Sequence, residues 1–258
     1  MHHSLVFFIF AHPDDAEICC GGLIVKLVKD GSEVHYLCCT DGSRGTFNPD
    51  ISPKHLAVIR DSELKSAAKD LGVKTVEILP HCDCDEIQEY FLRKEIIARI
   101  RRLQPEIVVT HDAWKPYLVH PDHIVTGLAA CRAAVFSPFP HIYPDTFSPG
   151  VNSVREVFLF DTDLPNMFID ISEVIERKIH LLSHFPSQME QAGAQQKMIR
   201  PDNRSNYDIG REMYEDIIRR TSTQAGVITG IRHAEAYRRF LVRNGHFDAR
   251  EQERIPGK

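Results

Sequence analysis

The stretch LVFFIF at residues 5–10, followed directly by AHPDDAE at residues 11–17, decides the fold and the chemistry of this chain. Six consecutive apolar residues predict a strand that is buried on both faces. The imidazole of His12 and the carboxylates of Asp14 and Asp15 follow at the point where that strand would end. Open α/β sheets bind their ligands beyond the carboxyl ends of the strands. The stretch therefore predicts a strand of such a sheet with a polar site at its end.

Strand and helix patterns alternate through the first two-thirds of the chain. Apolar runs predict strands at 5–10, 33–39, 74–79, 106–110 and 154–160, and amphipathic patterns predict helices at 16–29, 53–71, 86–103 and 121–135. Strands that alternate with helices favour a mostly parallel sheet with helices on both faces. We therefore expect an α/β fold.

The character of the sequence changes after Pro165. Helices are expected at 172–184, 202–220 and 233–242, and no Gly/Ser-rich linker precedes them. We therefore expect a single domain over residues 1–258, with an α/β core at 1–165 and a mainly helical extension at 166–258. Residues 137–150 are expected to form a loop, either at the border of a substrate pocket or as a plain surface connection. His2 and His3 are interpreted as part of a terminus or tag.

Composition excludes several classes of protein. The chain has 43% hydrophobic and 26% charged residues, which is ordinary for a soluble globular protein. Its net charge of −5 argues against a general nucleic-acid binder. No apolar run approaches the roughly 18 residues of a membrane span. Seven cysteines, an odd number, without a secretion signal favour reduced thiols in a cytoplasm.

A second polar cluster, His120-Pro121-Asp122-His123, follows another predicted strand at 106–110 and would meet the first cluster at the same sheet edge. His12, one Asp and a later His would give a metal three protein ligands and leave a position for water, as catalytic zinc sites do. The carboxylate left over could then act as a general base.

Each cluster taken alone has a plainer interpretation. An Asp pair after a strand also fits a helix cap, and His120-x-x-His123 lacks the helical i, i+4 spacing of a ligand pair. Pro121 favours a helix that begins directly after His120, so one His suits metal binding while the other, oriented by a carboxylate such as Asp122, suits protonation or charge stabilisation. Cys82 and Cys84 are spaced too closely for the usual zinc pair.

Together, AHPDDAE at 11–17, Gly21-Gly22 and HPDH at 120–123 resemble the LmbE/PIG-L family of zinc-dependent deacetylases. TDGSRG at 40–45, Arg60 with Glu63, and HAEAY at 233–237 extend the resemblance over nearly the whole chain. The resemblance implies a Rossmann-like three-layer sandwich that removes an acetyl group from an N-acetylglucosamine-type sugar or glycoconjugate. It further implies Zn²⁺ as cofactor, with other divalent transition metals as alternatives, and a homo-oligomer.

The resemblance also implies a role for individual residues. His12, Asp15 and His123 would bind the metal, and Asp14 would be the general base. His120, with Asp122 behind it, would stabilise the oxyanion or protonate the leaving amine.

Four further residues, Arg60, Glu63, Arg44 and Tyr117, would contact the substrate by the same resemblance. For Arg60 and Glu63, a surface ion pair at i, i+3 spacing is the alternative. Arg155 either supports the general base or simply flanks a strand. His111 ends a strand and could line the pocket, although a structural role is the plainer interpretation.

Two other functions stay open at this point. One is an amidase that cleaves a larger sugar–thiol conjugate. The other is a Rossmann-like protein that binds a sugar or nucleotide without catalysis. Against the latter, no Gly-x-Gly-x-x-Gly follows the first strand, and a binding protein would not need Asp14 beside Asp15.

Overall fold

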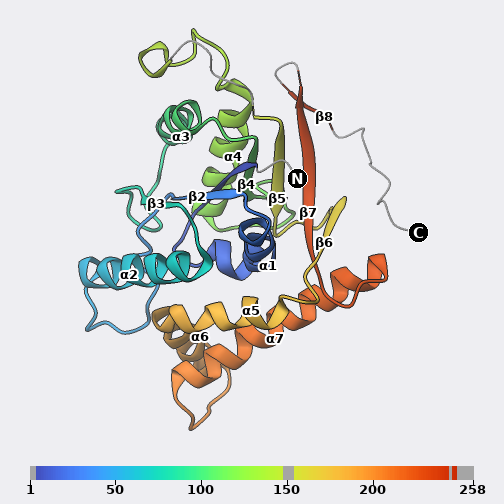
Figure 1. Ribbon diagram of the computed structural model, residues 1–258. Helices are drawn as coiled ribbons and strands as arrows, with labels where there is room; N and C mark the ends of the chain where they lie inside the picture. The colour runs from blue at the N-terminus through green and yellow to red at the C-terminus, as the bar shows by residue number, and fades with distance from the viewer. Residues whose placement is uncertain (1–3, 148–153, 244–245, 249–258) are drawn as a thin grey trace.

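The computed structural model describes residues 4–147, 154–243 and 246–248. Within this part of the chain, eight strands form one sheet (Figure 1). Its strands are β1 (Leu5–Phe10), β2 (Glu33–Cys38), β3 (Thr75–Ile78), β4 (Ile107–His111), β5 (Glu156–Phe160), β6 (Met167–Asp170), β7 (Ala234–Arg243) and β8 (His246–Asp248). The order is β3-β2-β1-β4-β5-β7-β6, with β8 paired to β7. The first five strands in this order are parallel, and β7 is antiparallel to its neighbours. The prediction of a mostly parallel sheet is confirmed.

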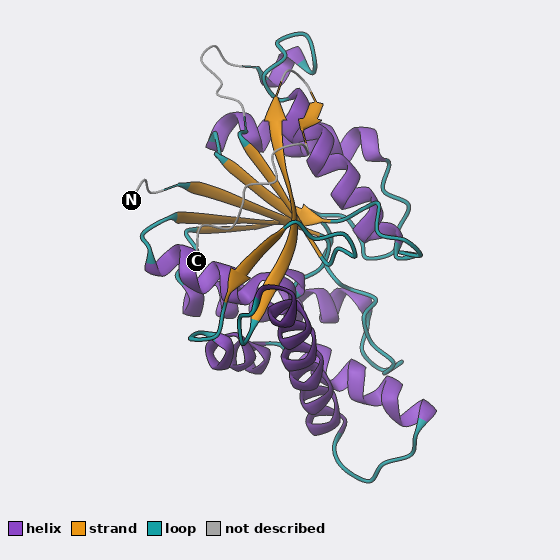
Figure 2. Ribbon diagram, turned by 90° about the vertical axis from the view of Figure 1, so that its right-hand side faces the viewer, coloured by secondary structure: helices purple, strands orange, loops and turns teal. Residues whose placement is uncertain are grey.

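Helices cover both faces of this sheet (Figure 2). They include α1 (Asp15–Lys29), α2 (Pro53–Leu71), α3 (Glu89–Leu103) and α4 (Pro121–Phe136). In β1, Phe8 and Phe10 pack with α1 and α2, whereas Phe7 and Ile9 pack with α3 and α4. Alternate side chains of one apolar run thus fill two separate cores. The expected Rossmann-like three-layer sandwich is confirmed.

The C-terminal part adds strands as well as helices. It contains α5 (Ile175–His180), the 3-10 helix η2 (Leu181–His184), α6 (Pro186–Ile199) and α7 (Asn206–Thr229), while a short 3-10 helix, η1 (Pro144–Thr146), lies in the expected loop. The prediction of a helix at 233–242 is wrong, because that segment is β7, which pairs with β5 and β6. Two neighbouring strands satisfy its backbone, which local periodicity does not reveal. The segment 166–258 is therefore not simply a helical extension, since β6, β7 and β8 belong to the main sheet.

Two features expected from the sequence lie outside the described residues, namely the terminus with His2 and His3 and the end of the expected loop, residues 148–150.

A buried carboxylate ties β7 to the middle of α1. The backbone N–H groups of Gly22 and Leu23 donate to the two oxygens of Glu235, each at 2.8 Å. Lys178 and the hydroxyl of Tyr237 donate to the same carboxylate, at 2.6 and 2.7 Å. A side chain at Gly22 would place its Cβ 2.9 Å from Glu235, so glycine permits this approach. The helix that begins with Asp15 is thus held by the last long strand of the sheet.

The strand order creates a natural binding edge between β1 and β4. These two strands are adjacent and parallel. From β1 the chain continues to β2 and β3 on one side, whereas β4 leads to β5 on the other. Connections that diverge in this way leave a crevice at the carboxyl ends of the two strands, where α/β proteins place their ligands.

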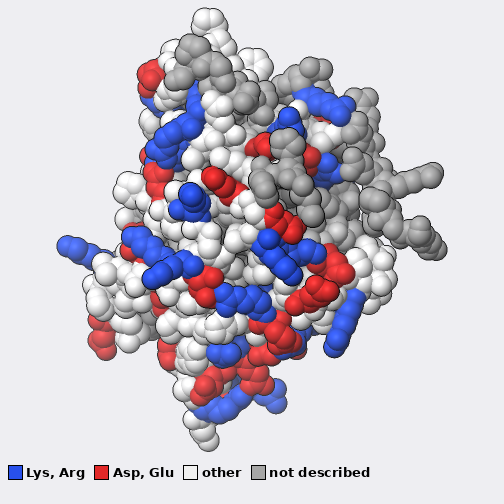
Figure 3. All heavy atoms as spheres, in the orientation of Figure 1, with Lys and Arg blue, Asp and Glu red and all other residues white. Residues whose placement is uncertain are grey.

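Charged side chains of both signs are mixed on the surface (Figure 3). In the face shown in Figure 3, basic and acidic side chains are interspersed, without a uniformly basic region. Among the described residues, no helix combines the length and apolar character needed to cross a bilayer.

Candidate active site

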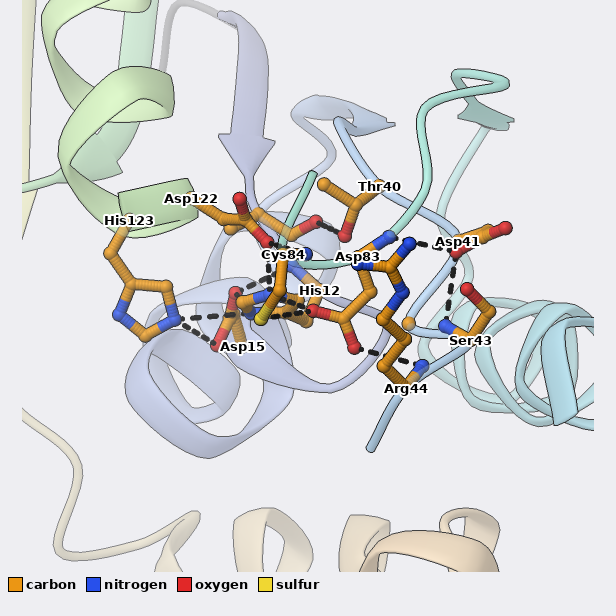
Figure 4. Close-up of polar contacts among 12 residues, drawn as sticks. His12, Asp15, Thr40, Asp41, Ser43, Arg44, Asp83, Cys84, Asp122 and His123 are labelled. Carbon is orange, nitrogen blue, oxygen red and sulfur yellow. Dashed lines mark hydrogen bonds and ion pairs between the residues drawn. The ribbon is translucent and has the colours of Figure 1, made fainter. Parts of the chain in front are cut away.

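The turn after β1 sends two neighbouring carboxylates in different directions. Asp14 has φ 154°, a conformation that costs a non-glycine residue roughly 1–3 kcal/mol. Its carbonyl accepts the N–H of Ile18 in the first turn of α1. As a result, the Asp15 side chain points toward His123 (Figure 4), whereas the Asp14 side chain pairs with Arg60. The predicted division between a metal-binding and a free carboxylate is therefore geometrically available.

The three predicted metal ligands converge (Figure 4). His12 Nδ1 lies 3.1 Å from His123 Nε2 and 3.5 Å from Asp15 Oδ2. His123 Nε2 lies 3.6 Å from Asp15 Oδ1. Burial lowers the pKa of His123 to about 3 despite the nearby Asp15, so its imidazole is neutral, as a metal ligand must be.

These spacings fit one metal ion. Four ligands bonded tetrahedrally at about 2.0–2.1 Å lie roughly 3.3 Å from one another. His12 Nδ1 and His123 Nε2 lie 3.1 Å apart, and each lies 3.5 or 3.6 Å from one oxygen of Asp15, Oδ2 for His12 and Oδ1 for His123. Two imidazoles and a carboxylate suit zinc and also accept other divalent transition ions. The residues present therefore fit the metal that the sequence predicts.

His111 lies inside this cluster. Its Nε2 is 3.1 Å from the backbone nitrogen of Ala11 and 3.2 Å from Asp15 Oδ2. Its ring stacks on that of His123, with centroids 4.3 Å apart. The sequence left both a structural role and a place in the pocket open for His111; in the structure it is the buried last residue of β4.

Two carboxylates hold the far side of the His12 ring. His12 Nε2 lies 3.1 Å from Asp122 Oδ2 and 3.3 Å from Asp83 Oδ1. Asp122 Oδ2 also accepts the backbone N–H of Cys84 at 2.8 Å. The expected position of Asp122 behind His120 therefore needs correction, because its hydrogen bonds among the described residues go to His12 and Cys84. Asp122 lies in the first turn of α4, where its fully buried side chain faces the end of β1.

Asp83 was missed by the sequence analysis. Its loop is braced against the loop after β2: the Asp83 N–H donates to Asp41 at 3.1 Å, and the Arg44 N–H donates to Asp83 at 3.2 Å (Figure 4). A usable signal existed, since Asp83 follows β3 and so emerges at the same sheet edge as the other clusters.

Arg60 is buried beside Asp14. Its Nη2 lies 3.1 Å from Asp14 Oδ1 and donates to the carbonyl of Pro13 at 3.0 Å. Nη1 donates to the carbonyl of Gly42 at 3.3 Å, and a Cβ at Gly42, where φ is 63°, would lie 2.7 Å from that nitrogen. Burial raises the pKa of Asp14 to about 7, while Arg60 opposes the rise. A carboxyl with a pKa near neutrality is well placed to accept and release a proton.

His120 lies beside the predicted metal ligands, and one of its ring nitrogens has no hydrogen-bond partner among the described residues. Its ring stacks on that of His123, with centroids 4.6 Å apart. Its Nδ1 is buried and has no hydrogen-bond partner among the described residues. Burial lowers the pKa of His120 below its ordinary value. A ligand atom of His120 also lies within 4.8 Å of ligand atoms of His12 and His123, so His120 belongs to the same cluster.

The other predicted substrate-binding residues lie away from the buried centre. Glu63 accepts the N–H and hydroxyl of Ser187 at 2.8 and 2.5 Å. It is buried, as is Arg60, so the alternative of a surface ion pair is wrong. Arg44 pairs with Asp85 at 2.6 Å on the exposed rim, and Tyr117 is 98% exposed on the loop between β4 and α4.

Arg155 lies at the opposite end of β5 from the site. It is exposed and pairs with Glu106 at 3.2 Å. Of the two predictions for this residue, flanking a strand is the one confirmed.

A Rossmann-like sheet with three convergent metal donors and a separate buried carboxylate at its edge has the parts of a metal-dependent hydrolase. The chain belongs to the PIG-L family, described as GlcNAc-PI de-N-acetylase, which it matches over residues 7–134. It is 34% identical to diacetylchitobiose deacetylase from Thermococcus kodakarensis, over 90% of this chain and 82% of the relative.

Two further relatives agree. The chain is 32% identical to the probable N-acetyl-alpha-D-glucosaminyl L-malate deacetylase 2 of Bacillus cereus, over 72% of this chain and 84% of that protein. The structure of N,N'-diacetylchitobiose deacetylase from Pyrococcus horikoshii, in complex with an inhibitor, superposes with a TM-score of 0.80. That match has 34% identity and covers 92% of this chain and 83% of the other. The family predicted from the motifs is thereby confirmed.

Proposed function

We propose that this chain is a metal-dependent hydrolase that removes the acetyl group from an N-acetylglucosamine-type sugar or glycoconjugate. The proposal depends on one observation. The donor atoms of His12, Asp15 and His123 converge, whereas the neighbouring Asp14 carboxylate points away from them and pairs with Arg60. A site that only binds a sugar has no use for the second carboxylate. The names of the relatives, deacetylases of chitobiose and of a glucosaminyl malate, support the substrate class and favour neither a non-catalytic protein nor a larger-amide hydrolase.

The buried residues have separate roles in the proposed hydrolysis. His12, Asp15 and His123 would hold the metal, which when bound supplies a Lewis acid for the acetyl carbonyl and for water. Asp14 accepts a proton from the attacking water. Arg60, at 3.1 Å, orients the Asp14 carboxylate and favours its ionised form.

His120 acts on the atoms of the substrate that gain charge during the reaction. A ring N–H of His120 donates a hydrogen bond to the developing oxyanion, or a protonated His120 gives its proton to the leaving amine and is protonated again by the proton that Asp14 took from water. The amide C–N bond breaks, and the products are acetate and the free amino sugar. Asp122 and Asp83 keep the His12 ring in its orientation throughout.

We propose zinc as the resident metal, because two imidazoles and one carboxylate with an open position are typical of catalytic zinc. Arg44 and Tyr117 are proposed to contact the sugar from the rim, and Glu63 to position the start of α6 through Ser187.

The test is acetate release from N-acetylglucosamine, N,N'-diacetylchitobiose and N-acetylglucosaminyl malate. Protein stripped of metal should be inactive and should recover activity with zinc, whereas Asp14→Asn should stay inactive after reloading. A panel of amides with larger acyl groups serves as the specificity control. Zinc-loaded protein that folds but releases acetate from none of the three sugars would overturn the proposal.

We also propose a cytoplasmic homo-oligomer. All seven cysteines are free, which supports a reducing compartment. Exposed apolar side chains on α7, such as Val227 and Ile228, offer surface for contact between subunits. Light scattering after size exclusion tests the oligomer, and a monomeric mass at micromolar concentration would contradict it.

A further inference from the structure

A second group of metal-binding side chains lies outside the candidate active site, where the end of α2 meets α5 and η2. Its members are Asp70, in the last turn of α2, His180, which ends α5, and His184, which ends η2. One ligand atom from each lies within 4.8 Å of the other two. None of these residues takes part in the proposed hydrolysis.

The His184 ring is already oriented as a ligand. Its Nδ1 lies 2.9 Å from the hydroxyl of Ser66, and its Nε2 lies 3.1 Å from Asp70 Oδ2. Metal-binding histidines commonly use the second ring nitrogen in a hydrogen bond that fixes the ring. Ser66 fills that role and aims Nε2 of His184 at the Asp70 carboxylate.

Arg177 holds the Asp70 carboxylate without occupying both of its oxygens. Arg177 Nη2 lies 2.8 Å from Asp70 Oδ1 and donates to the Asp70 carbonyl at 2.9 Å. Asp70 Oδ2 is left facing His184.

His180 distinguishes this cluster from an ordinary ion-pair network. Asp70, Arg177 and His184 already satisfy one another. His180 is exposed, and its imidazole has no hydrogen bond among the described residues. Its ring lies edge-on to that of His184, with centroids 6.0 Å apart. The His180 imidazole has no role in the ion pairs, but it supplies the third donor of a ligand set.

We propose that Asp70, His180 and His184 form a second metal site that binds a divalent ion such as zinc. Two imidazoles and a carboxylate favour zinc, nickel and copper over magnesium or calcium. An ion held there would join α2, which carries Arg60, to α5 and η2. Because it would bind the folded chain and not the unfolded one, it would raise thermal stability.

In the test, metal-stripped protein is dialysed against zinc, and elemental analysis measures how many zinc ions each chain binds. We expect wild type to bind one more zinc per chain than His180→Ala, and His12→Ala to lose a different equivalent. The double variant should lose both. His55→Ala, which changes an exposed histidine at the start of the same helix α2, is the matched control and should bind as wild type does. Equal stoichiometry and affinity in wild type and His180→Ala would overturn the proposal.

Two measurements guard against loss of fold. His180→Ala removes no side-chain hydrogen bond among the described residues, so its metal-free melting temperature should match that of wild type. Ser66→Ala removes no ligand but should weaken the second site by about tenfold. In a His12→Ala background, zinc should raise the melting temperature, and adding His180→Ala should abolish that rise. Because these readouts omit acetate release, failure here and failure of the deacetylase proposal are separable.

Discussion

The buried centre of the candidate active site and its exposed rim are built in different ways. In the centre, His12, Asp15 and His123 emerge from the end of β1 and the start of α4 and are fixed by Asp122, Asp83 and His111. On the rim, Arg44 and Tyr117 stand on loops in contact with solvent. Scaffold elements thus hold the reacting groups, whereas loops meet the variable part of a substrate. We expect substitutions in the centre to change the chemistry and substitutions on the rim to change selectivity.

The largest expected effect comes from removing a ligand in the centre. His12→Ala takes away the nitrogen that lies 3.1 Å from His123 Nε2 and should abolish both zinc retention and acetate release. Elemental analysis and an acetate assay on the same sample provide the test. Unchanged zinc content would show that the converging donors are not the metal site.

Asp14→Asn should separate catalysis from metal binding. A positioned general base contributes about 10²–10⁴-fold, so kcat should fall by that order while zinc content stays at the wild-type level. The amide keeps the size of Asp14 next to Arg60, which favours an intact fold. Near-wild-type kcat in a zinc-loaded sample would rule out Asp14 as the base.

Asp122→Asn probes the support of a ligand rather than the ligand itself. Asp122 holds His12 Nε2 at 3.1 Å, and loss of such a partner typically weakens metal affinity by about 10–100-fold. Competition with a chelator of known affinity measures the change. If Asp122 instead acted through His120, activity would fall while the zinc affinity stayed the same.

The smallest effect is expected on the rim. Tyr117→Ala should leave kcat for N-acetylglucosamine unchanged and raise KM for a disaccharide or conjugate by no more than ~10-fold, which corresponds to about 1.4 kcal/mol. Arg155→Ala, an exposed change at the other end of β5, is the control. A large fall in kcat for the monosaccharide would move Tyr117 from the rim to the reacting centre.

Much of the core fold could be predicted because its strands are buried on both faces. The apolar run of β1 is the clearest case. α2 has the predicted bounds, 53–71, and in the structure Ser52 caps it and Gly72, with φ 83°, ends it. β7 was missed because its partners, β5 and β6, come from distant parts of the chain. Helical periodicity in a segment such as 233–242 carries no information about pairing of that kind.

The same limit applies to the site. Strand ends indicated the two polar clusters at 12–15 and 120–123, because parallel strands share one ligand-binding edge. The choice of His12, Asp15 and His123 within them came from the family resemblance. Asp83 was overlooked because it follows β3, a short strand that is mostly half-buried. The partner of Asp122 depends on how the first turn of α4 faces β1, which is set by packing between distant elements and not by the local motif.

The buried Glu235 carboxylate has a consequence for how the protein is made. The carboxylate that accepts the Leu23 N–H lies 212 residues later in the chain. At a synthesis rate of about 5–20 residues per second, the ribosome adds that residue roughly 10–40 s after Leu23. Until then, α1 lacks its partner from β7, and the neighbouring Asp15 belongs to an unfinished scaffold. The motif at residues 11–17 is therefore synthesised long before its scaffold is complete. We infer that the nascent chain becomes active only after β7 has been added to the sheet.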